Sequence, residues 1–243
     1  MVVMGRVLER EVTIRHHECG SDSCLKLKDL LDYLQDVAAE HADELGVGLS
    51  SIRERRELWV LSRLRLSLTR GIRCGERLRL TTYPSGVDTL FALRQYTLTS
   101  GAEVVGRGTS GWLLLSASSF RPLRPSDCLP PELLSEELPS HFPTPGKLRR
   151  EAIEGARREY VVRASDLDEN NHLNNAQYGR FIGDALSLPG ELREVQVNYN
   201  HQALLGDVVC CGEARLPDGQ VYVDGVSPDG KTSYFQAQVR LGL

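Results

Sequence analysis

One order of elements, a single helix followed by several strands, is predicted twice along this chain, and that repeat most constrains the fold. The two copies flank a proline-rich segment, RPLRPSDCLPPELLSEELPSHFPTPG, which holds seven of the 11 prolines between Pro122 and Pro145. Proline lacks the backbone N–H that helices and central strands use, so neither element can continue far through this segment. We therefore read it as a linker between two units.

The first copy opens with a one-sided helix. Its apolar residues recur at three- and four-residue steps, at Leu27, Leu30, Leu31, Leu34, Val37, Ala38 and Leu45, and Gly46 is the expected stop. Apolar runs punctuated by Gly, Pro and Ser follow at 58–69, 77–83, 90–99 and 104–115. Such runs are typical of antiparallel strands.

The second copy has the same plan after the linker. A strand is predicted at 160–163, a helix at 175–186, and strands at 194–200, 208–214, 220–226 and 232–241. Cys74-Gly75-Glu76 and Leu205-Gly206-Asp207 each place a glycine and an acid before a strand. One helix and several strands bury their apolar faces when the sheet wraps the helix, so we predict an α+β protein of two tandem hotdog units. The predicted boundaries are 1–118, the linker 119–156, and 157–243.

Composition narrows the function class. The 243 residues are 41% hydrophobic and carry a net charge of −4, which does not attract a phosphate backbone, so we expect no nucleic-acid partner. No apolar run reaches the roughly 20 residues of a membrane span, and the N-terminus does not read as a signal peptide, so we expect a cytoplasmic protein. The spacing of the six cysteines matches neither a disulfide framework nor a paired C-x-x-C zinc site. The cluster of His16, His17, Cys19 and Cys24 matches no metal pattern, so no metal is expected.

The segment 165–178, SDLDENNHLNNAQY, is dense in carboxylate, amide and imidazole groups. Asp and Asn also make turns and helix caps, and Asn174 or Asn175 is a candidate cap for the second helix. However, Asp168, Asn170 and His172 stand at alternate positions, which share one side of an extended segment. We therefore predict that these three side chains converge on one site.

The pattern D-x-N-x-H-x-N-N-x-x-Y, from Asp168 to Tyr178, resembles the signature of the acyl-acyl carrier protein thioesterases. The first half also resembles this family, in Leu34-Gln35-Asp36-Val37-Ala38, His41, Leu45-Gly46, Trp59-Val60-Leu61-Ser62-Arg63, Tyr83-Pro84-Ser85-Gly86 and Trp112. The resemblance implies two hotdog units, with the catalytic motif in the second and the acyl chain held largely by the first. It implies hydrolysis of fatty acyl-acyl carrier protein, which releases free fatty acid and ends chain elongation.

The resemblance assigns catalysis to Asp168, Asn170 and His172, and to a fourth position that is usually Glu. Gln202 occupies that fourth position here. A neutral amide cannot take a proton from water, although it can orient water by hydrogen bonding, so activity could be lowered. Asp168 would act as nucleophile or as general base. Backbone N–H groups near Asn174 and Asn175, at the start of the helix, would stabilise the oxyanion, and no cofactor is needed.

An acyl carrier protein is acidic, so its docking surface should be basic. Lys147, Arg149 and Arg150 form one candidate patch where the linker enters the second unit, and Arg53, Arg55 and Arg56 form another. Nearby acids make a solvated charged face an equally good interpretation of each patch. The sequence leaves open whether the chain is a monomer or a homodimer.

Three alternatives remain open at this point. An acyl-coenzyme A thioesterase would use the same chemistry on the same pantetheine arm, and only the docking surface would separate the two. A weakly active or non-catalytic acyl-binding protein is suggested by Gln202, although the intact Asp168, Asn170 and His172 argue against it. A hotdog dehydratase has only the fold in its favour. The acyl chain length is not predicted.

Overall fold

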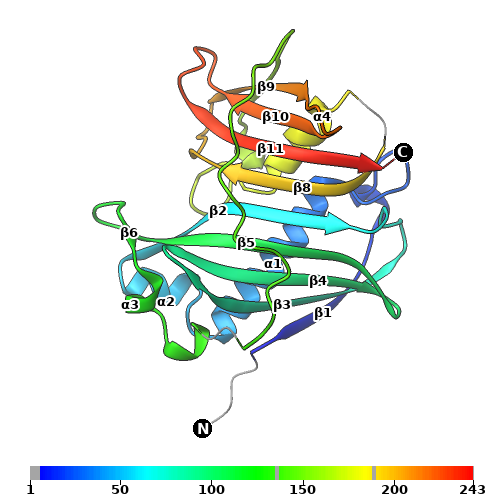
Figure 1. Ribbon diagram of the computed structural model, residues 1–243. Coiled ribbons are helices and arrows are strands. Elements are labelled where there is room, and N and C mark those ends of the chain that lie inside the picture. The colour runs from blue at the N-terminus through cyan, green and yellow to red at the C-terminus, as the bar shows by residue number, and fades with distance from the viewer. Residues whose placement is uncertain (1–5, 135–136, 188–189, 243) are drawn as a thin grey trace. The chain divides into compact units, whose positions relative to one another are not determined.

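The computed structural model describes residues 6–134, 137–187 and 190–242. Contacts between residues divide the chain into two units (Figure 1). Unit 1 comprises Met1–Ile14, Tyr33–Leu66 and Gly75–Pro145, and unit 2 comprises Arg15–Asp32, Ser67–Cys74 and Gly146–Leu243. Two segments of the first half, 15–32 and 67–74, therefore group with residues of the second half. The predicted domain boundaries stay a prediction.

Unit 1 contains a sheet with the strand order β1-β3-β4-β5-β2, and β6 pairs with β5. The strands are β1 Leu8–Thr13, β2 Glu57–Leu68, β3 Arg77–Asp88, β4 Phe91–Ser100, β5 Glu103–Ser116 and β6 Pro122–Leu123. The pairings of β1 with β3, β3 with β4, and β4 with β5 are antiparallel. Buried and less buried residues alternate along β1, as expected of a strand with one face on a core.

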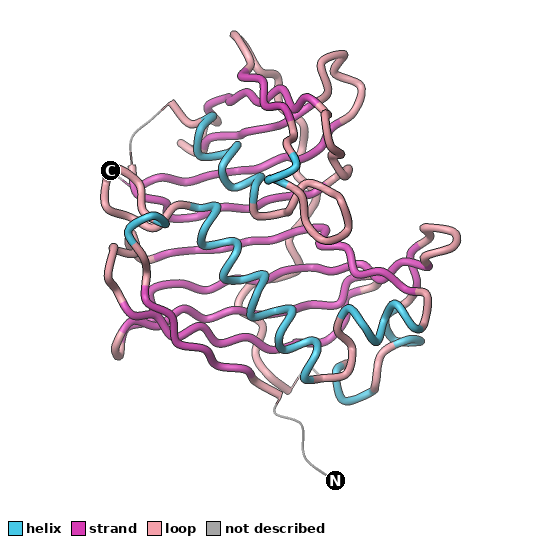
Figure 2. The backbone as a smooth tube through the Cα atoms, turned by 180° about the vertical axis from the view of Figure 1, so that it is seen from behind, coloured by secondary structure: helices cyan, strands magenta, loops and turns pink. Residues whose placement is uncertain are grey.

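Helix α1, Leu27–Glu44, is the long helix predicted from the leucine pattern. Figure 2 shows it crossing one face of the strands. Most of its apolar positions are buried, including Leu34, Val37 and Ala38, and the chain leaves the helix through Gly46 in the left-handed conformation (φ 70°). Gly46 therefore ends the helix as predicted, because glycine adopts this conformation without a steric penalty. A short helix, α2, Leu49–Glu54, follows.

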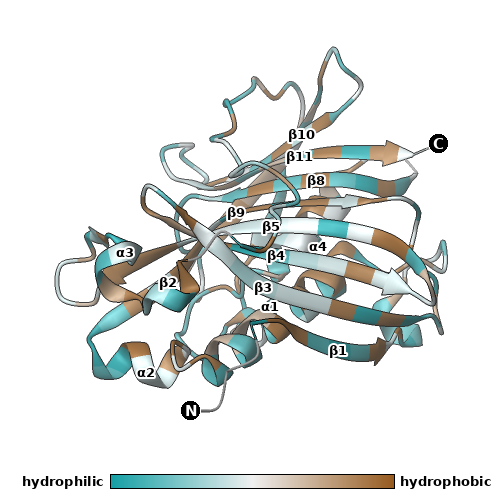
Figure 3. Cartoon of the chain, turned by 60° about the horizontal axis from the view of Figure 1, so that its bottom comes forward, coloured by the Kyte–Doolittle hydropathy of each residue, from teal (hydrophilic) through white to brown (hydrophobic). Residues whose placement is uncertain are grey.

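In unit 2 the strands pair antiparallel in the order β8-β11-β10-β9-β7. Its elements are β7 Arg158–Val161, α4 Gln177–Ala185, β8 Glu191–Tyr199, β9 Val208–Arg215, β10 Val221–Val226 and β11 Ser233–Gly242. Hydrophobic and hydrophilic residues alternate along β11 in Figure 3. Helix α4 lies against β9 and β10, and its Gly179 approaches the backbone of Lys28 so closely that a Cβ there would lie 2.8 Å from the Lys28 nitrogen.

In its described residues the predicted linker contains only short elements, namely β6, the one-turn helix α3, Pro125–Cys128, and a 3-10 turn, Pro131–Leu133. Its last part, residues 146–157, crosses the sheet of unit 2 (Figure 1). Gly146 O accepts hydrogen bonds from Gln196 Nε2 (2.7 Å) and Asn198 Nδ2 (3.1 Å). At the other end, Arg157 Nη1 pairs with Asp224 Oδ1 (2.5 Å). This last part of the linker is therefore fixed to the sheet by polar contacts at both of its ends.

The helix and strands predicted for each half are present, with boundaries shifted by a few residues. Helix α4 begins at Gln177 rather than near Asn175, because the residues before it form turns. Strand β1 and helix α2 were not predicted, since neither contains a long periodic run. In the described part of the chain, no helix has the length and apolar character that a membrane crossing requires.

Candidate active site

The predicted motif forms a tight turn in unit 2, between the short 3-10 turn Ala164–Asp166 and helix α4. Asp168 organises it: its Oδ1 accepts the backbone N–H groups of Asn170 (2.8 Å) and His172 (3.1 Å). The Asp168 N–H donates to His172 O (2.8 Å), which closes the turn. The turn therefore brings the carboxylate, the amide residue and the imidazole residue together.

The structure corrects one part of the expectation, because the motif is not an extended segment. Asn171 adopts the left-handed conformation (φ 59°), which Asn tolerates better than most residues, and the chain reverses there. The reversal arises because the Asp168 side chain captures N–H groups two and four residues ahead, as Asp does in turns. Asp168 and His172 are half-buried, and Asn170 is exposed.

A buried carboxylate holds the turn in place. Asp166 Oδ2 accepts the Arg163 N–H (2.9 Å), and Asp166 Oδ1 pairs with Arg180 Nη2 of α4 (3.1 Å). The Asp166 backbone carbonyl accepts the Asn174 N–H (2.9 Å) on the far side of the turn. Asp166 is only 6% exposed, so these contacts are shielded from water and tie the turn to the helix. The sequence identified Asp166 only as one of several nearby acids.

Gln202 lies on the segment that pairs with the turn. Leu173 N–H donates to Ala203 O (2.8 Å), and His172 forms an isolated bridge with Leu204. Gln202 is therefore one residue from the pairing partner of Leu173, and it is exposed. Next to it, His201 Nδ1 lies 2.9 Å from Ser233 O, so the His201 ring is engaged with β11.

The helix N-terminus differs from the prediction. The Asn174 N–H is not free, because it donates to Asp166 O, and the N–H groups of Ala176 and Gln177 donate to Asn174 Oδ1 and O (2.9 Å each). The loop thus satisfies most of these donors by folding back on itself. Among the described residues, only the Asn175 N–H of this group finds no partner, so the predicted oxyanion donor reduces to Asn175.

Tyr178, in helix α4, is a buried aromatic residue next to the motif. It is buried against Phe181, Tyr199 and Phe235, and burial raises its pKa above the ordinary value of a phenol. Its hydroxyl donates to His201 O at 3.4 Å. Tyr178 is therefore a packing residue that joins α4 to the segment carrying Gln202.

The first half of the chain carries a turn with the same backbone, at residues 19–25. Three backbone hydrogen bonds of the first turn, each written from N–H to O, are Gly20 to Cys24 (2.8 Å), Ser23 to Gly20 (3.0 Å) and Leu25 to Ile72 (2.8 Å). The second turn has the same three, at the same lengths: Asp168 to His172, Asn171 to Asp168 and Leu173 to Ala203. Ser23, like Asn171, is left-handed (φ 62°). By this correspondence, Gly20, Asp22, Cys24 and Gly71 stand where the second turn has Asp168, Asn170, His172 and Gln202.

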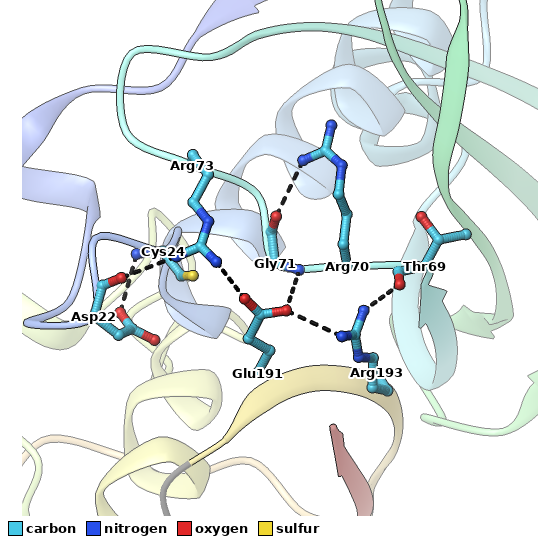
Figure 4. Close-up of polar contacts among 8 residues, drawn as sticks. All are labelled: Asp22, Cys24, Thr69, Arg70, Gly71, Arg73, Glu191 and Arg193. Atoms are coloured by element: carbon cyan, nitrogen blue, oxygen red, sulfur yellow. Dashed lines mark hydrogen bonds and ion pairs between the residues drawn. The ribbon is translucent and has the colours of Figure 1, made fainter. Parts of the chain in front are cut away.

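Figure 4 shows the surroundings of this first turn. Glu191 Oε2 accepts the Gly71 N–H (3.0 Å) and pairs with Arg193 Nη2 (3.1 Å), while its Oε1 pairs with Arg73. Cys24 is buried, and its Sγ would lie 2.7 Å from a Cβ placed on Gly71. The position that corresponds to the exposed Gln202 is therefore closed by an ion-pair cluster.

Metal ligation finds no support in the part of the chain that the structure describes, where no group of three or more His, Cys, Asp or Glu side chains could hold an ion. His16 Nδ1 lies 3.2 Å from Cys74 Sγ, whereas His17 points to Glu18. The predicted docking cations Lys147, Arg149 and Arg150 are all exposed, on the segment fixed to the sheet of unit 2.

Family models match most of the chain. The model described as the acyl-ACP thioesterase N-terminal domain matches residues 5–129, and the acyl-ACP thioesterase C-terminal domain matches residues 150–225. The chain belongs to the acyl-ACP thioesterase family. The family resemblance identified in the sequence is thereby confirmed.

Two curated relatives of this thioesterase-family chain are plant proteins. The acyl-[acyl-carrier-protein] hydrolase FATB2, chloroplastic, of Cuphea viscosissima is 24% identical over 98% of this chain and 60% of its own length. The oleoyl-acyl carrier protein thioesterase 1, chloroplastic, of Arabidopsis thaliana is 25% identical over 84% of this chain and 63% of its own length. The chain thus spans about three fifths of the length of these relatives.

Solved structures share the fold along the whole chain. An acyl-ACP thioesterase from Bacteroides thetaiotaomicron has a TM-score of 0.87 at 19% identity, covering 98% of each chain. The 12:0-ACP thioesterase from Umbellularia californica has a TM-score of 0.79 at 16% identity, covering 100% of this chain and 99% of its own. The predicted fold of two tandem hotdog units is confirmed.

Proposed function

We propose that this family member hydrolyses the thioester of fatty acyl-acyl carrier protein and releases free fatty acid. The observation that carries the proposal is the turn in which Asp168 Oδ1 accepts the N–H groups of Asn170 and His172. These bonds fix one carboxylate oxygen. Among the described residues, Oδ2 has no hydrogen-bond partner, so it is the oxygen that remains available to a reactant.

In this mechanism Asp168 Oδ2 attacks the thioester carbonyl carbon, or removes a proton from a water that does so. The C–S bond breaks, and the pantetheine thiolate leaves and takes up a proton. Where Asp168 is the nucleophile, the acyl group is then bound to Oδ2 as an anhydride, and water hydrolyses this anhydride, which restores the carboxylate and supplies the proton. His172 has no side-chain partner among the described residues, so its imidazole is available to transfer that proton. The Asn175 N–H is the backbone donor available to the oxyanion. The net reaction consumes one water and produces a carboxylic acid and a thiol.

The side chain at position 202 determines how fast the proposed hydrolysis can be. Its exposed amide can hold the attacking water by hydrogen bonds, but it cannot accept the water's proton. The Asp168 carboxylate then has to supply all of the base function. This observation favours a second candidate function, a slow or non-catalytic acyl-binding protein.

The carrier-docking patch of Lys147, Arg149 and Arg150 is also part of the proposal. The segment that bears them is held at Gly146 by Gln196 and Asn198, and beyond the patch by Arg157. Fixed and exposed cations suit an acidic carrier, because their charges need no reordering on binding. Cytoplasmic location stays a prediction from the sequence, and the sequence made no choice between monomer and homodimer.

One experiment tests these points together. Fatty acid release is measured by mass spectrometry on matched acyl-carrier and acyl-coenzyme A thioesters of increasing chain length. Asp168→Asn keeps an oxygen that can accept both N–H bonds of the turn but removes the charge, so turnover should fall about 100-fold or more with the fold intact. A preference for coenzyme A would change the partner. Binding of acyl chains without turnover would favour the binding protein.

The docking patch is tested in the same panel. Arg149→Glu with Arg150→Glu should raise KM for carrier substrates and leave coenzyme A substrates nearly unchanged. Arg79→Glu, on the exposed face of β3, is the matched control. If the double variant and the control behave alike, the patch does not dock the carrier.

A further inference from the structure

Three of the six free cysteines gather around the first turn, residues 19–25, and the loop that pairs with it. Cys19 and Cys24 belong to the turn itself, whereas Cys74 comes from a distant segment of the sequence. Cys24 forms an isolated bridge with Arg73, and the Cys74 N–H donates to Ser23 O (3.0 Å). All of these residues belong to unit 2. The spacing of the cysteines in the sequence does not indicate this grouping, because it depends on pairing between segments far apart in the chain.

An exposed imidazole lies against Cys74. His16 Nδ1 is 3.2 Å from Cys74 Sγ, and His16 begins the 3-10 turn His16–Glu18. Cys19 follows this turn: its N–H donates to His16 O (3.2 Å), and its Sγ donates to Arg15 O (3.3 Å). His16 is exposed, and both thiols are half-buried. Cys19 and Cys74 therefore lie against the same short turn, where a small molecule from solution can reach them.

The two thiols also interact with each other. Burial raises the pKa of Cys19 to about 11, and a side-chain hydrogen bond with Cys74 and the charge of that thiol act in the same direction. A hydrogen bond between two thiols places their sulfur atoms next to each other, which a disulfide also requires. Because the Cys19 thiol is held protonated, Cys74 is the thiol suited to ionise first, and the adjacent His16 can accept its proton.

The remaining cysteines lack this combination. Three of them, Cys24, Cys210 and Cys211, are buried. Cys128 is half-buried, as Cys19 and Cys74 are, but burial and the neighbouring carboxylates of Glu57 and Asp127 raise its pKa. A thiol reacts as its thiolate, so Cys128 is a poor nucleophile. Among the six cysteines, all of which lie in the described residues, only the pair of Cys19 and Cys74 combines access to solvent, a neighbouring imidazole and a second thiol.

We propose that Cys74 and Cys19 form a site of reversible thiol–disulfide exchange with a low-molecular-weight disulfide, and that His16 is its base. In a reducing compartment such as the predicted cytoplasm, disulfides are usually transient and redox-sensing. The new bond would join two segments that are distant in the sequence, which restrains the unfolded chain and should make the oxidised protein more stable. The inference does not depend on the proposed hydrolysis, because none of these residues belongs to the Asp168 turn.

The exchange has two steps. His16 Nδ1 takes the proton from Cys74, and the thiolate attacks one sulfur of the small disulfide, whose S–S bond breaks. A mixed disulfide forms at Cys74, and the first small thiolate leaves and takes up the proton from His16. Cys19 then attacks the Cys74 sulfur, and its proton passes to the second small thiolate as that group leaves. In total, two protein thiols are oxidised to one disulfide, and the small disulfide is reduced to two thiols.

Oxidised glutathione, added to the reduced protein, is the probe for this exchange. Wild type should lose two hydrogen atoms without retaining glutathione, and mass spectrometry of unreduced peptides should show Cys19 joined to Cys74. Cys19→Ser should stop at the mixed disulfide, with one glutathione on Cys74. Cys74→Ser should form neither product, and His16→Asn should slow the reaction about tenfold or more at pH 7. Cys128→Ser, the matched control, also removes a half-buried thiol and should react as wild type does.

Wild type alone also decides the matter should a variant fail to fold. Iodoacetamide should alkylate Cys74 about tenfold or more faster than Cys128, because only Cys74 has an imidazole beside its thiol. The Tm should rise by about 5 °C or more on oxidation and return on reduction with dithiothreitol. No reaction with oxidised glutathione, equal alkylation rates, a glutathione that remains on Cys74, or a Tm that does not rise would each overturn the inference.

Discussion

The turns at residues 19–25 and 167–173 have the same backbone and different side chains. Both close through the same three backbone hydrogen bonds, and both reverse at a left-handed residue, Ser23 or Asn171. The second turn has a carboxylate and an imidazole where the first has Gly20 and Cys24. The same backbone turn can therefore occur with or without catalytic groups, and the chemistry depends on the side chains that the turn carries.

The two turns also differ in what covers them. Gly71, which corresponds to Gln202, is buried and its N–H is held by Glu191, whereas Gln202 is exposed. Leu204 and Leu205, which follow Gln202, are 50% and 62% exposed. A reactant can therefore approach the second turn from the side that is closed in the first.

The largest predicted difference is in kcat, and it comes from the second-to-last residue of each turn, which is His172 in the second turn and Cys24 in the first. His172→Ala should lower kcat about 100-fold or more, because a proton-transfer group typically contributes that much. Cys24→Ala, at the corresponding position, should leave kcat within about twofold, since the buried thiol only packs. Steady-state rates on one acyl-carrier substrate measure both. Equal losses in the two variants would mean that the first turn also takes part in the reaction.

Much of this arrangement could be predicted from the sequence. The leucine spacing predicted α1 and its end at Gly46. Gly75 and Gly206, the two glycines that the sequence placed with an acid before a strand, both take the left-handed conformation (φ 79° and 86°). The Gly75 N–H donates to Ile14 O, directly after β1, and the Gly206 N–H donates to Val162 O, directly after β7. Local patterns of this kind depend on only a few neighbouring residues, so they can be read directly.

Other features could not be predicted, because they depend on distant residues. Period-two spacing suggested that Asp168, Asn170 and His172 share an extended face, but the side-chain capture of N–H groups by Asp168 folds the segment into a turn. Glu191 closes the first turn from a strand more than 100 residues away, and no local pattern indicates that contact.

A smaller effect is predicted at the closed position. Gly71→Ala would place a Cβ 2.7 Å from Cys24 Sγ and 3.1 Å from Glu191 Cδ, so it should lower the free energy of unfolding by about 1–3 kcal/mol. Gln202→Ala, at the exposed counterpart, should change it by less than about 0.5 kcal/mol. Urea unfolding of both variants measures the difference. A fully stable Gly71→Ala would mean that the first turn is not tightly closed.

The smallest effect expected is a gain of activity. Gln202→Glu restores a carboxylate that can take the proton from water, and we expect kcat/KM at pH 7 to rise about tenfold. Because residue 202 is exposed, the new carboxylate should ionise near the ordinary Glu pKa of about 4.3. The gain should therefore be present above about pH 5 and disappear as the pH falls through that pKa, since the protonated acid cannot accept a proton. Gln202→Met, which has neither the charge nor the amide, controls for the change of side chain and should be slower than wild type. If Gln202→Glu and wild type have the same pH–rate profile, residue 202 is not in the catalytic set, and the difference between the two turns reduces to Asp168, Asn170 and His172.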